Sequence, residues 1–380
     1  MAMPPRTRRQ FLRWSAAALG LAAARPPWAQ AAAAGVAPAP RPLDLLILGG
    51  TGFLGPHVVE HALARGHRVT LFNRGRSAAG AFGGRAELLV GDRDPNVGAG
   101  IAALEGTRRW DAVIDISGYL PRHVRATASL LRGRARRYAF VSTMGVYDRT
   151  RPGTVTEASP MLPLADPGNE DYAGPRYGPQ KAEADRVVQS LWGERATSVR
   201  PTFILGPGDD TDRYAYWIAR IAAGGDVLGP RTDAAPLQWV DVRDLCPWVV
   251  ELCERDVGGA FNAAAPPVDW DAVLATLQPF AGEALRLRRP SGAVVEALRI
   301  PQPLTRRDAP VVRLDGTLAT RHGLAYRPLA DTSRATWEWW RALPAERRAR
   351  AEARWPGRDL EREAWLQSAR AAPGFIANPS

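Results

Sequence analysis

The chain has 380 residues, of which 46% are hydrophobic, and a formal net charge of +11 at pH 7. This length allows one large core or two modest ones, and the two cysteines exclude a disulfide-stapled scaffold. Five of the positive charges are arginines within residues 1–40, which contain no acidic residue. The excess of positive charge in the rest of the chain is mild, and its basic residues form no dense block, so we expect no nucleic-acid partner.

The N-terminal segment has the pattern of an export signal. A charged region around Arg8 and Arg9 precedes the alanine-rich run SAAALGLAAA, and the small residues AQA follow at positions 29–31. The run is too short to be a stable membrane anchor. Because the arginine pair followed by QFL resembles the twin-arginine motif, we expect residues 1–31 to be a twin-arginine signal peptide. The export machinery would then be a partner and the protein periplasmic; an alanine-rich tail is the alternative.

After a linker at residues 32–42, the sequence alternates short apolar runs with helical segments. LDLLILGG is followed by the helical PHVVEHALARG, and then come RVTLFN, AELLVGD, WDAVIDISG and RYAFVSTM. Short β-rich runs alternating with helices predict βαβ units and a parallel sheet covered on both faces. We therefore predict an α/β fold, a doubly wound parallel sheet of the Rossmann type, over residues 43–204.

From about Leu205 the alternation loosens, and proline and glycine become more frequent. We expect residues 205–330 to form a smaller substrate-binding lobe interleaved with the sheet. Residues 331–380 are charged and aromatic with helical spacing, which predicts a C-terminal helical extension. On a helix, Cys246 and Cys253 would lie about 10 Å apart, too far for a disulfide, so we expect both in the core.

A glycine-rich turn follows the first predicted strand. GGTGFLG places Gly49, Gly52 and Gly55 at equal spacing, which allows a tight turn, close approach to a pyrophosphate and close packing of the next helix. The free N–H groups of that helix would face the phosphates. We expect these glycines, together with Phe53 and Leu54, to bind NAD or NADP; an ordinary glycine turn is the alternative.

Later strand ends supply further candidate cofactor contacts. Asn73 stands where an NAD-preferring site usually has an acidic residue, and Arg74 follows it. This favours NADP over NAD, unless Arg74 is a solvated loop cation. Asp92 and Arg93 follow the third strand and are expected to border the adenine, and Ser117 follows the fourth.

The helix after the glycine turn also carries HVVEH, residues 57–61, which matches a zinc-protease pattern. That helix already belongs to the predicted dinucleotide crevice, and the sequence offers no evident third ligand. We therefore expect no metal and interpret His57 and His61 as exposed helix histidines.

Lys181 is the only lysine in a chain whose lysines and arginines total 50. It ends the segment YGPQK, four residues after Tyr177. Arginine is a wide planar fork whereas lysine is a compact ammonium, so we interpret Lys181 as a point charge needed in a tight space. A surface cation retained by chance is the alternative. A phenol with a pKa of about 10 is a poor base, and an ammonium beside it would stabilise the phenolate.

Taken together, these motifs resemble the extended short-chain dehydrogenase/reductase superfamily, in its NAD-dependent epimerase/dehydratase family. The resemblance runs from residue 43 to 326 and rests on GGTGFLG, GDRD, FVSTMGVY, YGPQK, RPTFILGPG and LQWVDVRDL. It implies that Tyr177 is the general acid/base and that Lys181 lowers its pKa and holds the nicotinamide ribose. It also implies that Thr143 binds the reacting oxygen. The implied activity is an NAD(P)-dependent oxidoreductase or epimerase reaction at a hydroxyl or carbonyl carbon.

Two departures from the family narrow the expected reaction. Met144 and Gly145 stand where the family's dehydratases carry Asp-Glu, which disfavours dehydration. Leu237 stands where nucleotide-sugar epimerases place a diphosphate-binding arginine. We therefore expect the substrate to be a sugar-like small molecule whose binding needs no diphosphate-binding arginine.

The loop GPGDDTDR offers candidate hydroxyl binders for such a substrate, namely Asp209, Asp210, Asp212 and Arg213. Loop and cap residues are the alternative for each of them. Because an exported enzyme has no dinucleotide pool, its cofactor should be tightly bound. A non-catalytic dinucleotide- or RNA-binding protein of the same fold is the alternative function, and a homodimer is left open.

Overall fold

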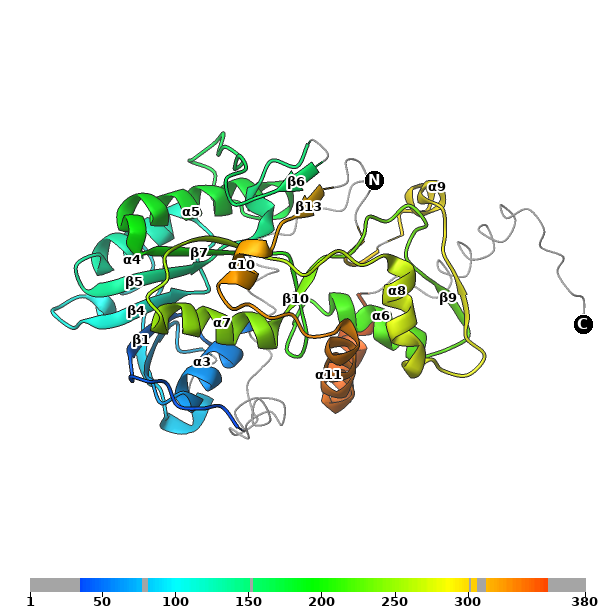
Figure 1. Ribbon diagram of the computed structural model, residues 1–380, viewed down its shortest axis with the longest axis horizontal. Helices are drawn as coiled ribbons and strands as arrows, with labels where there is room; N and C mark the ends of the chain where they lie inside the picture. Colours follow the sequence, from blue (N-terminus) through cyan, green and yellow to red (C-terminus); the bar gives the residue numbers. More distant parts are fainter. Residues whose placement is uncertain (1–34, 77–80, 151–152, 301, 306–311, 355–380) are drawn as a thin grey trace, which may run out of the picture.

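The computed structural model describes residues 35–76, 81–150, 153–300, 302–305 and 312–354 (Figure 1). The predicted signal peptide, residues 1–31, lies outside these ranges, as do residues 355–380 of the expected C-terminal extension. Within the described ranges, no helix has the length and apolar character needed to cross a membrane.

Seven parallel strands form the central sheet, in the order β11-β7-β5-β4-β1-β2-β3. Their bounds are β1 (Asp44–Leu48), β2 (Arg68–Asn73), β3 (Glu87–Val90), β4 (Trp110–Asp115), β5 (Ala135–Val141), β7 (Ala196–Pro201) and β11 (Gly259–Ala263). The strand order reverses between β1 and β4, which is where open α/β sheets form their binding crevice. The predicted doubly wound α/β fold is confirmed.

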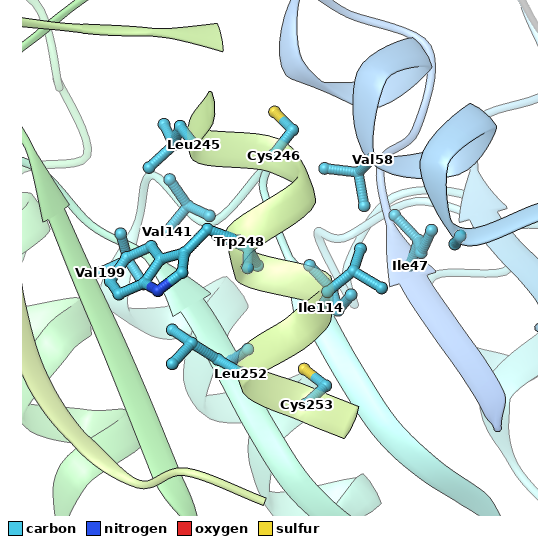
Figure 2. Close-up of a cluster of buried hydrophobic side chains, with 14 of the residues drawn as sticks. Ile47, Val58, Ile114, Val141, Val199, Leu245, Cys246, Trp248, Leu252 and Cys253 are labelled. Atoms are coloured by element: carbon cyan, nitrogen blue, oxygen red, sulfur yellow. The ribbon is translucent and has the colours of Figure 1, made fainter. Parts of the chain in front are cut away.

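Helices cover both faces of this sheet. Figure 1 shows α3 (Leu54–Ala64) and α7 (Val242–Glu254) on one face, and α4 (Pro121–Leu131) and α5 (Tyr177–Trp192) on the other. Each face has its own cluster of buried apolar side chains. Both cysteines are free and buried in α7, as expected for core residues. Figure 2 shows them among the apolar side chains between α7, α3 and the sheet.

A second lobe is built from the later part of the chain. Its helices are α6 (Arg213–Ala222), α8 (Trp270–Leu277), α9 (Gly292–Ala297), α11 (Leu329–Ala342) and α12 (Ala345–Glu352), whereas α10 (Thr317–Arg321) packs against β11 of the central sheet. Its short parallel pairs are β8 (Phe203–Leu205) with β10 (Trp239–Asp241) and β9 (Asp226–Leu228) with β12 (Arg286–Arg288). A third short pair, β6 (Gly153–Val155) with β13 (Val312–Leu314), lies beside α5. Short 3₁₀ turns are η1 (Ala81–Gly84), η2 (Ala102–Leu104), η3 (Met144–Val146), η4 (Gly174–Arg176), η5 (Gly193–Arg195) and η6 (Gln278–Phe280).

The two parts of the chain are interleaved. Helix α7 and strand β11 fall within the segment expected to form the substrate lobe, yet they cover and extend the central sheet. The chain after residue 204 therefore contributes both to the sheet and to the second lobe. Figure 1 shows α6, α8 and α11 beyond the end of α7, on the far side of the molecule from the sheet.

A buried ion pair ties α5 to the sheet. The Nε atom of Arg200, on β7, lies 2.9 Å from Oδ2 of Asp185, on α5. Arg200 Nη1 also donates to the hydroxyl of Tyr147 over 2.7 Å, and that hydroxyl donates to Oδ1 of Asn262, on β11, over 2.7 Å. All four residues are at most 2% exposed. In such a low dielectric, removal of one partner leaves an uncompensated charge.

We predict that Arg200→Met lowers the free energy of unfolding by about 3–5 kcal/mol, because Asp185 remains buried without its partner. Urea denaturation followed by circular dichroism measures the effect. Arg68→Met removes the arginine of the exposed pair between Arg68 and Asp44 and is the matched control. It is expected to leave the urea midpoint nearly unchanged, because water screens exposed pairs. Equal losses in the two variants would contradict the prediction.

Candidate active site

Close backbone contacts fix the glycine turn between β1 and α3. Gly49 has a φ of 115° and Gly50 a φ of 95°, conformations that side chains disfavour. A Cβ on Gly55 would lie 2.2 Å from the carbonyl carbon of Gly50. Gly52 differs, because a Cβ there would meet nothing within 4 Å. The fold itself therefore requires three of these glycines, whereas Gly52 leaves room beside the turn for a ligand.

The N-terminus of α3, which follows this turn, has no side-chain cap. Phe53 precedes the first helical residue, Leu54, and the first turn contains no acidic side chain. The first N–H groups of a helix lack partners within the helix and favour anions. The turn and the helix end thus fit the pyrophosphate of a dinucleotide.

Asn73, at the end of β2, supports the glycine turn. Its side-chain Nδ2 donates to the carbonyl of Gly49 over 3.0 Å, and its Oδ1 accepts from the N–H of Gly75 over 2.9 Å. Arg74 is exposed beside it. Asp92 accepts a hydrogen bond from the N–H two residues later, at 2.9 Å. Asn73 therefore shapes the edge of the crevice, and Arg74 is the accessible cation there.

A buried polar network lies at the ends of β1 and β4. Arg93 forms an ion pair with Asp115, which is fully buried, and donates to the hydroxyl of Ser117 over 3.2 Å. The hydroxyl of Tyr138 donates to Asp115 over 2.7 Å. Burial raises the pKa of Asp115, but the charge of Arg93 and these hydrogen bonds outweigh it, so the net pKa is lowered. The guanidinium expected to border the adenine is thus bound to Asp115.

Sequence reasoning missed Asp115, although one signal was present. An acidic residue that ends an apolar central strand, as in WDAVID, must have a partner when it is buried. The sequence offered no rule for choosing that partner.

Thr143 and Tyr177 lie together because glycines let their segments approach. Gly178, in the first turn of α5, packs closely against Gly145. A Cβ on Gly178 would lie only 2.4 Å from the carbonyl oxygen of Gly145. A Cβ on Gly145 would in turn lie 3.5 Å from Oγ1 of Thr143 and 3.7 Å from Cδ1 of Tyr177. Oγ1 of Thr143 also accepts from the N–H of Gly145 over 3.1 Å.

The electrostatics of Tyr177 differ from the expectation. Burial raises the pKa of its phenol above the ordinary value, while a hydrogen bond with Thr143 and the positive charge of Arg213 act in the opposite direction. Lys181 was expected to supply that positive charge; the partners of its Nζ are the backbone carbonyls of Gly118 and Val141.

Lys181 occupies the tight space that its uniqueness suggested. It is 3% exposed, and its Nζ donates to the carbonyl oxygens of Gly118, over 2.7 Å, and Val141, over 2.8 Å. The ring centroid of Phe140 lies 4.1 Å from Nζ. Burial lowers the pKa of Lys181 to about 7, although the charges of Asp115 and Asp185 oppose the shift. The side chain therefore fixes α5 on the carboxyl ends of two central strands.

Two tyrosines missed from sequence border the same region. Tyr119 is 40% exposed, and its ring stacks on Tyr172 with centroids 5.3 Å apart and an interplanar angle of 25°. Nζ of Lys181 lies 5.7 Å from the Tyr119 centroid. Burial raises the pKa of the Tyr119 phenol, and the charge of Tyr177 acts in the same direction.

The loop after β8 has both buried and accessible polar groups. Oδ1 of Asp209 accepts from the hydroxyl and the N–H of Thr211, and Asp212 forms ion pairs within the protein. The carboxylates of Asp209 and Asp212 thus bind groups of the protein itself, which favours a role in the loop structure over binding of substrate hydroxyls. Asp210 is exposed, and the side chain of Arg213 is 37% exposed, so both are accessible to a ligand.

The expectation of exposed histidines on α3 is wrong for His57. It is 5% exposed, and its Nε2 lies 2.9 Å from the carbonyl oxygen of Pro207. Burial lowers its pKa to about 4. His61 is half-buried, and burial lowers its pKa to about 4 as well. Within the described part of the chain, no group of three His, Cys, Asp or Glu side chains is arranged to hold a metal ion.

Solved structures with this fold include two in complex with NAD. The Bordetella bronchiseptica enzyme WbmH in complex with NAD+ is 18% identical, with a TM-score of 0.60 over 80% of this chain and 99% of that one. The UDP-glucuronic acid 4-epimerase from Bacillus cereus in complex with NAD is 13% identical, with a TM-score of 0.57 over 78% of this chain and 97% of that one. At this identity the likeness shows the fold alone.

Curated relatives match by sequence over part of their length. The chloroplast stem-loop binding protein of 41 kDa b from Arabidopsis thaliana is 28% identical over 218 residues, covering 53% of this chain and 52% of that protein. The 2'-dehydrokanamycin reductase of Streptomyces kanamyceticus is 26% identical over 221 residues, covering 56% and 59%. This chain thus spans between half and three fifths of the length of these two relatives.

One match covers more than half of the chain and takes in the glycine turn, Thr143, Tyr177 and Lys181. Residues 45–264 fit the sequence model of the NAD dependent epimerase/dehydratase family. The chain therefore belongs to the NAD-dependent epimerase/dehydratase family.

Proposed function

We propose that this chain is an NAD(P)-dependent oxidoreductase or epimerase acting at a hydroxyl or carbonyl carbon of a sugar-like small molecule. The observation that carries the proposal is the placement of Thr143 and Tyr177 against one another, held by the close approach of Gly178 to Gly145. In this family fold, the carboxyl ends of the strands border the dinucleotide crevice.

This geometry suggests a role for each of the site residues. A bound nicotinamide would accept or donate the hydride, which leaves one proton for the protein to manage. Tyr177 exchanges that proton with the substrate oxygen, and Thr143 donates a hydrogen bond to the same oxygen. Arg213 favours the phenolate form of Tyr177. Lys181 keeps Tyr177 in place by docking α5 on the sheet and is the ammonium nearest the expected ribose position.

We propose NADP as the preferred cofactor, with NAD as the alternative. The end of β2 has Asn73 in the place of an acidic residue, and Arg74 beside it is exposed. An arginine here accommodates a 2′-phosphate, whereas an acid would bind the ribose hydroxyl. Because the solved neighbours named above hold NAD, both dinucleotides belong in every binding test.

Three features support a sugar-like substrate and a reaction other than dehydration. The stacked pair of Tyr119 and Tyr172 offers an aromatic surface of the kind that lines small-molecule sites. Leu237 is 2% exposed and packs in the core of the second lobe, so it cannot replace a diphosphate-binding arginine. Met144 and Gly145 provide neither the acid nor the base that eliminates water.

A second candidate function comes from one relative. The Arabidopsis protein is named as a stem-loop binding protein, so a non-catalytic RNA-binding role for this chain is the alternative. The retention of Thr143, Tyr177 and Lys181 favours an enzyme, since RNA binding has no need of a paired hydroxyl and phenol.

We also propose that residues 1–31 direct export of the folded protein by the twin-arginine route to the periplasm. Folding before export would let a dinucleotide travel inside the protein. A tightly held cofactor that returns to its starting state in each cycle suits epimerisation or a coupled oxidation and reduction.

We predict that Tyr177→Phe lowers turnover by about 10²–10⁴-fold, because the proton can no longer be exchanged at this position. A panel of sugars and nucleotide sugars is offered with NAD+ and with NADP+, and the nicotinamide absorbance is followed. Dinucleotide affinity should be unchanged in the variant, since only the hydroxyl is lost. Tyr326→Phe, which removes a hydroxyl that accepts from the N–H of Ala264, is the control and should retain turnover. An accepted substrate that Tyr177→Phe converts at the wild-type rate would contradict the proposal.

Export is predicted to depend on the arginine pair. Residues 1–42 are fused to a reporter that is active only when it is exported in the folded state. The fusion should give periplasmic activity, and the double variant Arg8→Lys with Arg9→Lys should abolish it, because the motif is read as a pair. A fusion without periplasmic activity, or with activity that survives the double change, would overturn the export proposal.

A further inference from the structure

The two stacked tyrosines lie at the carboxyl end of a central strand. Tyr119 stands between the end of β4 and the start of α4, and its stacking partner Tyr172 belongs to residues 166–173, a segment without helix or strand. The carbonyl oxygen of Gly118, the residue before Tyr119, binds Nζ of Lys181. That Nζ lies 5.7 Å from the centroid of the Tyr119 ring. The pair therefore borders the lysine that docks α5 on the sheet.

One arginine ties the segment 166–173 to the rest of this region. Arg122 is in the first turn of α4, and its Nε and Nη2 donate to the two carboxylate oxygens of Glu170 over 2.6 and 3.1 Å. Its Nη1 and Nη2 donate to the two oxygens of Asp94 over 2.7 and 3.1 Å. Asp94 is 7% exposed and lies in the loop after β3. Arg122 thus joins that loop, α4 and the segment that carries Tyr172.

The geometry of these ion pairs makes them an effective restraint. A single exposed pair contributes little because water screens it, but bidentate pairs that share one guanidinium form a network. Hydrogen bonds from Arg122 lower the pKa of Asp94 and of Glu170, so both carboxylates are charged at neutral pH. Nε2 of Gln180, on α5, also donates to the carbonyl oxygen of Asn169 and holds the same segment to that helix.

We propose that Arg122 is a positioning residue of the active site. By binding Glu170 and Asp94 together, it holds the segment 166–173 so that Tyr172 stacks on Tyr119 and the two rings form an aromatic wall of the substrate site. The C–H groups on one face of a sugar ring are apolar, and aromatic rings offer them a flat apolar surface. Sugar binding at this wall rests on the proposed function, whereas the restraint of the segment by Arg122 does not.

Limited proteolysis tests the restraint without substrate. Chymotrypsin is added to the full chain, and cleavage after Tyr172 is followed by mass spectrometry, because this rate reports how often the segment leaves its folded position. Arg122→Gln and Glu170→Gln should each raise the rate by about tenfold, because hydrogen bonds between charged groups are lost. Arg122→Lys keeps the charge but cannot bind both carboxylates as a fork, so its rate should lie between those of Arg122→Gln and the wild type.

Arg125→Gln is the matched control, since Arg125 is an exposed arginine on the same helix. It removes one positive charge from α4 without touching Glu170 and should leave the cleavage rate unchanged. If Arg122→Gln fails to fold, Glu170→Gln decides, because it breaks the same contact and leaves Arg122 bound to Asp94.

Steady-state kinetics with a substrate that the wild type accepts tests the aromatic wall. Tyr172→Leu and Arg122→Gln should each raise KM by about tenfold and leave kcat within about twofold, because the contact binds ground state and transition state alike. The double variant should be no worse than Tyr172→Leu alone, since Arg122 acts through Tyr172. Arg125→Gln should keep the wild-type KM.

Three results would overturn the inference. An unchanged cleavage rate in both Arg122→Gln and Glu170→Gln would mean that Arg122 does not hold the segment. Faster cleavage with an unchanged KM in Arg122→Gln and Tyr172→Leu would mean that the wall does not bind the substrate. Additive rises of KM in the double variant would mean that Arg122 does not act through Tyr172. Failure of the proposed enzyme function is distinguishable, because absence of wild-type turnover would remove the sugar-binding role while the cleavage rates still decide the restraint.

Discussion

The site depends on the burial of one ammonium group. Lys181 is 3% exposed, and its Nζ is bound by the carbonyl oxygens of Gly118 and Val141, which follow β4 and end β5. Burying a cation is unfavourable unless such partners replace its water, so the lysine fixes α5 on the carboxyl ends of two central strands. Tyr177 lies one turn earlier on the same helix and is thereby placed at the crevice. A guanidinium is wider and could not occupy the same space beside Phe140.

The remaining chemistry is assembled from segments far apart in the chain. The glycine turn and Asn73 shape the pyrophosphate side, and the contact between Gly178 and Gly145 brings Thr143 to the phenol. The positive charge of Arg213, at the start of α6, acts to lower the pKa of the same phenol. The family fold thus supplies the dinucleotide crevice, whereas Arg213 comes from the second lobe. Substrate selection would then lie with the lobe, the stacked tyrosines and the loop 209–213.

Features that depend on local sequence pattern could be predicted from the sequence. Features that depend on contacts between residues far apart in the chain mostly could not. Alternating strands and helices, together with the glycine spacing, predicted the doubly wound fold, and the lone lysine predicted a tight site. The burial of His57 was not foreseen, because its partner Pro207 is 150 residues away. The partners of Asp212, Arg347 and Arg354, lie 135 and 142 residues away, on α12 and just after it, where no motif marks them. The acceptors of Lys181 are backbone carbonyls, which have no sequence signature, so its spacing from Tyr177 could not reveal them.

The most direct test of this account is the identity of the dinucleotide that the protein carries. The chain is purified and denatured, and any released dinucleotide is identified by mass spectrometry, for the wild type, for Lys181→Arg and for the exposed control Arg176→Lys. The account predicts near-stoichiometric NADP, or NAD, from the wild type and from Arg176→Lys, and a marked loss from Lys181→Arg. A wild-type protein that carries no dinucleotide and binds neither added NAD nor added NADP would contradict it.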